Sequence, residues 1–197
     1  MKAVVLTFNG HRLTAPTSGK FIFRHGTASI AGTAYKTVQI GNQEWLAENL
    51  RLDDGGAGIY TGQSAPYTSE HFYTWDAMTR ISSLLGDGWH VPSKAEFETM
   101  ISAVGGDSVA AKILKSTHGW FEGNGTDNRG FNATPAGWWE SGAFRGASLS
   151  AWFYSTTSDE SDADYAYVLF LRSWDDAAMY LDKKGVTAHS IRLVRSV

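Results

Sequence analysis

The chain contains no cysteine. This absence excludes disulfide bonds, zinc sites with thiolate ligands and thiol nucleophiles. The six histidines are scattered along the sequence, without the short spacing that brings two imidazoles to one metal ion. Asp127 and Asn128 offer adjacent oxygen ligands of the kind that calcium prefers, but only two such ligands adjoin each other. We therefore expect no bound metal and no cofactor, and a calcium site near Asp127 stays open as an alternative.

Long apolar runs and basic tracts are also missing. No run approaches the roughly 18 residues that cross a bilayer, so membrane insertion is not expected. With 17 Lys and Arg against 20 Asp and Glu, the net charge is −3, and a nucleic-acid partner is not expected either. The first residues begin apolar but break at Asn9-Gly10 and lack a small-residue cleavage site, which is not typical of a secretory signal. If the protein is extracellular or virion-associated, it leaves the cell without a recognisable signal peptide.

Motifs of known catalytic chemistry are absent from the sequence as well. There is no Gly-x-Ser-x-Gly elbow that would expose a serine nucleophile on a sharp turn. The adjacent acids Asp53-Asp54 lie in a glycine-rich stretch, where a solvated loop is the simpler interpretation. We therefore predict that the protein is not an enzyme.

Aromatic residues, by contrast, are abundant. They make up 13% of the chain, with 8 Trp and 8 Tyr. Large rigid side chains suit a binding surface because they bring contact area at low entropic cost. They also fill the core of a fold that is rich in loops, so the sequence leaves both uses open.

The first part of the chain predicts a small β-structure. Residues 3–8 are typical of a strand that ends at the tight-turn dipeptide Asn9-Gly10, and residues 20–24 predict a second strand. The small residues of 26–32 make a plausible boundary. We assign residues 1–33 to an N-terminal β-hairpin element and residues 34–197 to the main domain.

Two helices are predicted in the main domain. Residues 71–85 carry apolar side chains at spacings of three or four, which indicates an amphipathic helix. A second helix begins after Pro92, because Ser93 and Glu96 form the pattern of a capping box. Residues 109–114 predict a short helix or turn.

Short strands dominate the remainder. Residues 35–40 alternate in the period-two pattern of a strand, whereas residues 53–69 are rich in Gly, Ser, Thr and Pro and predict a loop. Further strands are expected at 151–157, 165–171, 179–181 and 190–194. Two helices and a run of short antiparallel strands predict an α+β fold.

Several motifs, in this order and spacing, resemble the Fibrobacter succinogenes major paralogous domain. They are Val38–Leu50, Tyr73–Ala77, Gly88–Ser93, Gly125–Asp127, Gly130-Phe131, Pro135–Gly137 and Ser190–Arg195. The resemblance implies a C-type-lectin-like fold, distantly akin to formylglycine-generating enzymes. It also implies a relation to the lectin-like scaffolds of retroelement-diversified variable proteins, among them phage tail proteins that select host receptors.

Departures from the family pattern gather in the last third of the chain. Trp138-Trp139 stands where the family usually carries Tyr-Arg, and residues 172–180 have no fixed counterpart. Trp, Tyr, Asp, Ser and Arg at these positions are typical of a recognition surface. The predicted ligand-binding residues are Trp139, Glu140, Ser141, Arg145, Trp152, Trp174, Asp175, Asp176 and Tyr180.

Two interpretations of these residues compete. In one, residues 138–146 and 172–180 lie on one face with Trp152, and Trp139 and Trp174 contribute most to binding. In the other, Trp174 and Tyr180 pack across strands and the acids are solvated turn residues. Four other aromatics occur in family motifs and are expected in the core: Trp45, Trp75, Trp89 and Phe131.

The sequence therefore predicts a non-catalytic domain that recognises a protein or glycan on the surface of a host or neighbouring cell. The predicted setting is a diversified variable protein or a phage tail tip, within a larger fibre or surface assembly. The alternative is a structural decoration module of a surface or virion assembly, without a dedicated ligand site.

Overall fold

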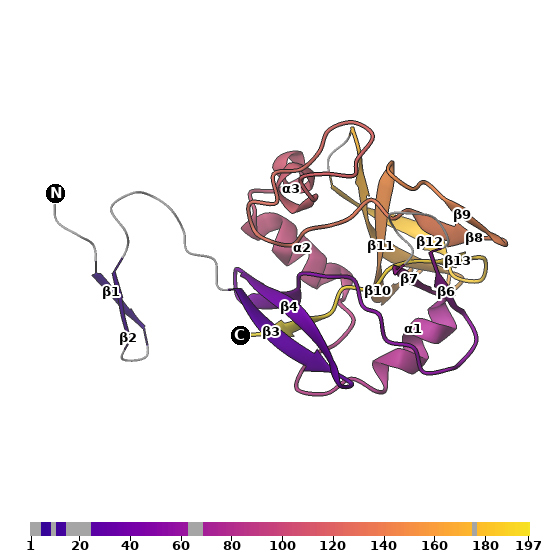
Figure 1. The fold of residues 1–197 in the computed structure, drawn as a ribbon, viewed down its shortest axis with the longest axis horizontal. Helices are drawn as coiled ribbons and strands as arrows, with labels where there is room; N and C mark the ends of the chain where they lie inside the picture. The colour runs from indigo at the N-terminus through magenta and orange to yellow at the C-terminus, as the bar shows by residue number, and fades with distance from the viewer. Residues whose placement is uncertain (1–4, 9–10, 15–24, 63–68, 175–176) are drawn as a thin grey trace.

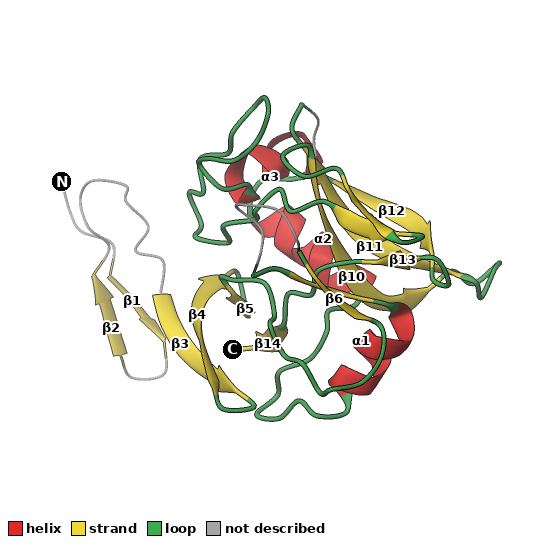
Figure 2. Ribbon diagram, turned by 45° about the vertical axis from the view of Figure 1, so that its right-hand side comes forward, coloured by secondary structure: helices red, strands yellow, loops and turns green. Residues whose placement is uncertain are grey.

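The computed structural model describes residues 5–8, 11–14, 25–62, 69–174 and 177–197, and it combines helices with several antiparallel sheets (Figures 1 and 2). The α+β class predicted from the sequence is confirmed. The helices are α1 (Trp75–Ser82), α2 (Lys94–Ala103) and α3 (Asp107–Leu114). The sequence predicted a short helix or turn at residues 109–114. The structure has a helix there, α3, which begins two residues earlier at Asp107.

A four-stranded sheet joins the beginning and the end of the main domain. Its order is β14-β5-β4-β3, from Val194–Ser196, Gln43–Leu46, Thr33–Ile40 and His25–Ile30. Val194 pairs with Trp45, which in turn pairs with Val38, so the last strand closes against the first family motif. Residues 25–30, which the sequence placed before a boundary near residue 33, therefore belong to the same sheet as β4.

A second sheet carries the candidate surface. It has the order β10-β11-β12, formed by Ser150–Ser158, Tyr165–Arg172 and Ala178–Lys183. Trp152 lies opposite Phe170, and Val168 lies opposite both Tyr154 and Tyr180. Because paired residues in an antiparallel sheet point to the same side, these five aromatic and apolar side chains share one face.

Short pairs of strands complete the fold. β6 (Ile59–Thr61) pairs with β7 (His71–Tyr73), and β13 (Thr187–Ala188), β8 (Trp138–Glu140) and β9 (Ala143–Arg145) form a three-stranded sheet. β1 (Val5–Phe8) and β2 (His11–Thr14) form a two-stranded sheet of their own, in which β1 falls within the strand predicted at 3–8, whereas its partner β2 was not predicted. The strand predicted at residues 20–24 lies outside the described residues.

The helix predicted for residues 71–85 is wrong at its beginning. His71–Tyr73 is strand β7, and the Tyr73 N–H and C=O exchange hydrogen bonds with His189. The helix starts only after Thr74, whose side chain accepts a hydrogen bond from the Ala77 N–H. Apolar spacing alone did not reveal the strand, because three residues are too few to display a period.

The second helix begins as predicted. Ser93 accepts from the Glu96 N–H at 3.3 Å, and Glu96 Oε2 accepts from the Ser93 N–H at 2.8 Å. This reciprocal capping box satisfies two backbone donors that have no partner within the helix. After α2, Gly105 and Gly106 adopt φ of 115° and 91°, which turns the chain into α3.

Two hydrophobic clusters lie on either face of the β10–β11–β12 sheet. One contains Phe97 of α2 with Phe153 and Leu169, and the other contains Met78 of α1 with Tyr154 and Val168. Figures 1 and 2 show α2 and α1 on different sides of this sheet. The predicted core positions of Trp45, Trp89 and Phe131 are confirmed, whereas Trp75 is only half-buried.

Arg192, in the last family motif, crosses the core as a buried cation. Its side chain is 1% exposed and donates to the carbonyls of Leu46, Phe131 and Asn132 and to Asn49 Oδ1. Burial lowers the pKa of Arg192 to about 10, so it stays protonated at neutral pH. It joins β5 to the loop around Phe131 by donating hydrogen bonds to backbone carbonyls of both.

No helix among the described residues is long and apolar enough to cross a membrane.

Candidate functional site

The β8–β9 hairpin sorts its side chains onto two sides. Ser141 and Gly142 form its turn with φ of 47° and 92°, the left-handed pair that a tight hairpin requires. Trp138 pairs with Arg145, and Trp139 pairs with Phe144. Since side chains alternate along a strand, Trp138 and Arg145 lie on one side and Trp139 on the other.

Four aromatic side chains from four strands meet on the first side, and we call them the aromatic face: Trp138, Trp152, Phe170 and Tyr180. The Trp152 ring is central, with ring centroids 5.2 Å from Trp138, 4.0 Å from Phe170 and 6.0 Å from Tyr180. These are distances at which aromatic rings attract each other. Tyr180 is 54% exposed and the other three are half-buried.

Charged groups border the aromatic face. Arg145 Nε donates to Glu140 Oε2 at 2.9 Å across the hairpin, and both side chains are substantially exposed. The Arg172 guanidinium lies over the Phe170 ring, with its Cζ 5.2 Å from the ring centroid. The border thus presents both signs of charge next to exposed ring surface, as the core and rim of protein interfaces do.

A buried imidazole supports the aromatic face from below. The His189 ring stacks on Trp152 at 5.4 Å and meets the edge of Tyr154 at 4.7 Å. His189 Nε2 donates to Asp182 Oδ2 at 2.6 Å, while its Nδ1 has no hydrogen-bond partner among the described residues. Burial is the largest single effect and raises the pKa of Asp182, but the hydrogen bond and charge of His189 and the hydrogen bonds from Lys183 and Thr187 together outweigh it, and the net pKa is lowered. The carboxylate is therefore ionised and fixes the imidazole under Trp152.

Trp139 belongs to a different surface from Trp152. Its ring stacks on Tyr60 of β6 with centroids 3.9 Å apart, and it packs beside Phe144 and the buried Phe72. An open pocket of about 440 Å³ adjoins this stack and is lined by residues of β6 and of the β8–β9 hairpin. Residues 59–61, expected to be loop, are thus a strand that contacts a predicted ligand-binding residue.

Trp174 lies beyond the end of β11 and is 58% exposed. The preceding residue holds it in place, because the Ser173 N–H donates to the Leu149 carbonyl at 2.9 Å. The Phe121 N–H donates to the Ser148 carbonyl, which brings a second exposed aromatic side chain to this loop cluster. Asp175 and Asp176 lie outside the described residues.

The structure brings together part of the predicted set. Trp152, Tyr180, Glu140 and Arg145 border one surface, whereas Trp139 points to the other side of its hairpin and Ser141 occupies the turn. Trp138 was missed, although the sequence held a signal for it. The Ser141-Gly142 dipeptide indicates a two-residue turn, and counting back from it places residue 138 on the same side as Glu140.

The described residues contain no group of three or more His, Cys, Asp or Glu side chains that would hold a metal ion. Asp127 has a backbone role instead, since its Oδ1 accepts from the Asn132 N–H at 2.7 Å. Burial raises the pKa of Asp127, so its pocket disfavours a carboxylate charge.

Residues 38–195 match the protein family described as the Fibrobacter succinogenes major domain. The chain belongs to this family. The matched span of the Fibrobacter succinogenes major domain begins within β4 and ends within β14, so it includes the aromatic face and the sheets on both sides of α2. No curated protein and no solved structure matches the chain.

Proposed function

We propose that this protein is a non-catalytic binding domain that recognises a protein or glycan on a cell surface through the aromatic face. The observation that carries the proposal is the cluster of Trp138, Phe170 and Tyr180 around Trp152. Contact of aromatic surface with water is unfavourable. A partner that covers this surface removes it from water, and this burial stabilises the complex.

The support beneath the rings favours recognition over simple filling of space. Trp152 is held from three directions, by the stacked imidazole of His189, by Phe170 and by a hydrogen bond from its Nε1 to Ser150 Oγ at 3.0 Å. A preorganised ring loses little conformational entropy when a ligand covers it. The ion pair of Glu140 and Arg145 at the edge supplies polar partners and orientation.

We further infer a C-type-lectin-like fold and a setting in which the domain is displayed, as on a diversified variable protein or a phage tail tip. The mixed helices and antiparallel strands, and the closing of the domain by β14, support this fold. The departures from the family pattern at residues 138–141 and 172–180 support a variable surface. Sequencing of the neighbouring DNA tests this setting, and a reverse transcriptase with a near-copy of the 3′ coding segment is expected.

The proposed ligand surface extends from the aromatic face toward Trp174 and toward Ser141 at the turn of the β8–β9 hairpin, whereas Trp139 offers a second contact area on the other side of that hairpin. Tyr180 and Trp174 are the most exposed of the predicted aromatic residues, so they offer the largest area for a partner to cover. Trp139 has one ring face occupied by Tyr60, and its contribution to binding is therefore expected to be smaller than that of Tyr180.

The test is binding of the fluorescently labelled protein to a panel of bacterial cells and to a glycan array. Saturable binding to one cell type or glycan class is expected, and Tyr180→Ala and Trp174→Ala should each weaken it at least about 30-fold, as central aromatic anchors do. Protease treatment of the cells distinguishes a protein ligand, whose binding is lost, from a glycan ligand, whose binding persists.

Leu84→Ala is the matched control, because Leu84 is also 54% exposed but follows α1, away from the described strands of the aromatic face. It should leave binding unchanged, and all three variants should keep the melting temperature of the parent. Binding that survives both aromatic substitutions would disprove the assignment of this surface. Absence of binding to every cell and glycan would favour the decoration module instead.

A further inference from the structure

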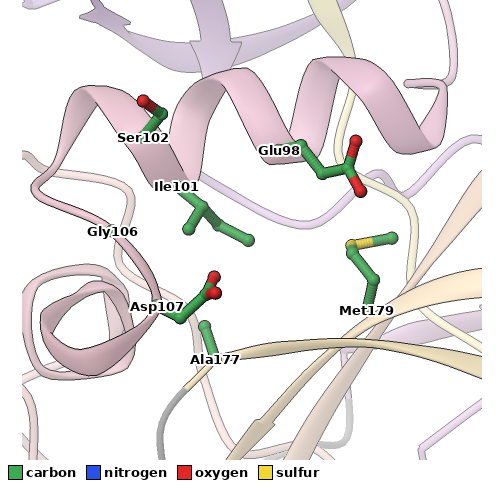
Figure 3. A pocket seen from close by; sticks show the side chains of 7 residues that line it. All are labelled: Glu98, Ile101, Ser102, Gly106, Asp107, Ala177 and Met179. Carbon is green, nitrogen blue, oxygen red and sulfur yellow. The ribbon is translucent and has the colours of Figure 1, made fainter.

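A second candidate site lies on the opposite face of the β10–β11–β12 sheet from Tyr180. It is a pocket of about 510 Å³ between α2, the beginning of α3 and the beginning of β12 (Figure 3). Met179 lines it, and since Met179 and Tyr180 are neighbours on one strand, they point to opposite faces. The pocket is therefore independent of the aromatic face.

The shape of the pocket follows from the turn between the two helices. α2 ends at Ala103, and the positive φ angles of Gly105 and Gly106 redirect the chain before α3 begins at Asp107. A Cβ added at Gly106 would meet nothing within 4 Å, so this wall of the pocket is bare backbone beside open space. The diverging helices leave a gap above Ala177 that no side chain fills among the described residues.

The floor of the pocket is apolar, and packing against the core holds its side chains in place. Ile101 and Ala177 are each 4% exposed and belong to the hydrophobic cluster around α2, and the half-buried Met179 packs against the same cluster. A ligand that reaches this floor covers hydrocarbon that is already held in place by packing. An aliphatic chain is the group that gains most from such a contact.

The rim of the pocket carries two negatively charged carboxylates. Glu98 and Asp107 come from different helices, and Figure 3 shows their carboxylates on different sides of the Ile101 side chain. The Ser102 hydroxyl adds a third polar group, and none of the described lining residues is basic. Two separated carboxylates above an apolar floor are complementary to a cation on an aliphatic stem.

The rim carboxylates are available to such a cation. Glu98 has a contact with Lys94 at 3.7 Å, one helical turn away, and since Glu98 is exposed and Lys94 partly exposed, the contact is weak and can be exchanged for another cation. Asp107 has no ion-pair partner within the described parts of the chain. Its position in the first turn of α3 suits the helix dipole, but this role leaves its outer oxygen free to accept.

We propose that this pocket binds an arginine side chain of a partner protein, with the guanidinium between Glu98 and Asp107 and the methylene stem on Ile101 and Met179. A guanidinium presents five N–H donors in a plane, so it can donate to carboxylates on two sides at once. It is also weakly hydrated, which makes contact with an apolar floor less costly than for an ammonium group. A divalent cation fits less well, since the described residues hold no cluster of three acidic or His ligands.

The test uses the full-length protein, labelled with 15N, and follows amide shifts during titration with N-acetyl-arginine-N-methylamide. The neutral isostere N-acetyl-citrulline-N-methylamide has nearly the same shape without the charge. The arginine compound should shift the amides of the pocket residues in a saturable way, and the citrulline compound should not. The double variant Glu98→Gln, Asp107→Asn should weaken arginine binding about tenfold or more.

Glu122→Gln is the matched control, because it removes an exposed carboxylate outside the pocket and should leave the titration unchanged. Melting temperatures establish that the variants are folded, and the comparison of arginine with citrulline needs no variant at all. Equal shifts with both compounds, shifts centred elsewhere, or binding that survives the double variant would overturn the proposal. Calcium chloride that perturbs the same amides more strongly than arginine would also overturn it.

Discussion

Trp89 is buried and Trp174 is exposed, so the two residues test opposite environments of tryptophan in this chain. Trp89 is 4% exposed and packs in the cluster around α1, with the Arg195 guanidinium 4.7 Å from its ring centroid. Trp174 is 58% exposed. Trp89→Ala should therefore lower the free energy of unfolding by about 3–5 kcal/mol, because it leaves a large cavity. Trp174→Ala should change it by less than about 0.5 kcal/mol. Urea unfolding followed by circular dichroism measures both, and equal losses would contradict the division.

The hydrogen bond between Asp182 and His189 should make the stability of the folded protein depend on pH in the acidic range. Burial raises the pKa of Asp182, but the hydrogen bond and charge of His189 and the hydrogen bonds from Lys183 and Thr187 together lower it by more, so the folded value lies below the unfolded one. The pair therefore stabilises the fold above the unfolded pKa of about 3.9 and loses this effect as pH falls through the folded value.

Asp182→Asn should flatten that dependence. The parent protein is expected to lose stability more steeply than the variant between about pH 5 and pH 2, because the variant carries no carboxylate to protonate at this position. Urea unfolding at a series of pH values gives the two slopes. Parallel slopes would show that His189 does not depress the pKa of Asp182.

At the scale of elements, the start of α2 was predictable because capping depends on neighbours in sequence. Ser93 and Glu96 satisfy each other's backbone donors within one turn. Ser93→Ala should destabilise the protein by about 1 kcal/mol, the usual cost of losing a capping side chain. Ser102→Ala, at an exposed position of the same helix, should be neutral within about 0.5 kcal/mol. Thermal unfolding compares them, and similar melting temperatures for the two variants would refute the capping role.

Other elements were not predictable, because their partners are remote in sequence. β7 occupies residues that have a helical spacing of apolar side chains, and it is held as a strand by β6 and by His189. The strand predicted at 190–194 is wrong for most of its length, because Ser190 forms only an isolated bridge with Phe153, Val194 begins β14, and residues 191–193 lie in no strand. Long-range hydrogen bonds override local preference in short elements.

At the scale of the whole molecule, the structure predicts where the main domain begins. β3 pairs with β4 along its length and contributes the buried side chain of Ile30. A chain that begins at residue 25 should therefore unfold with the same midpoint as the full-length protein. A chain that begins at residue 33 should lose about 2 kcal/mol or more, since it lacks the apolar burial of Ile30 and leaves an edge of β4 unpaired. Calorimetry of both chains checks this, and equal midpoints for all three proteins would place the boundary near residue 33.

The sequence by itself determined the family, the α+β class, the capped start of α2 and the core positions of Trp45, Trp89 and Phe131. These follow from motifs, local hydrogen bonding and apolar patterning, which act over a few residues. Only the tertiary structure decided which side of its hairpin each tryptophan faces, that Trp138 joins Trp152, that Trp139 stacks on Tyr60, and that His189 lies beneath the aromatic face. The physical reason is that strand register and the packing of distant elements place these side chains, and a shift of one residue in register would reverse them.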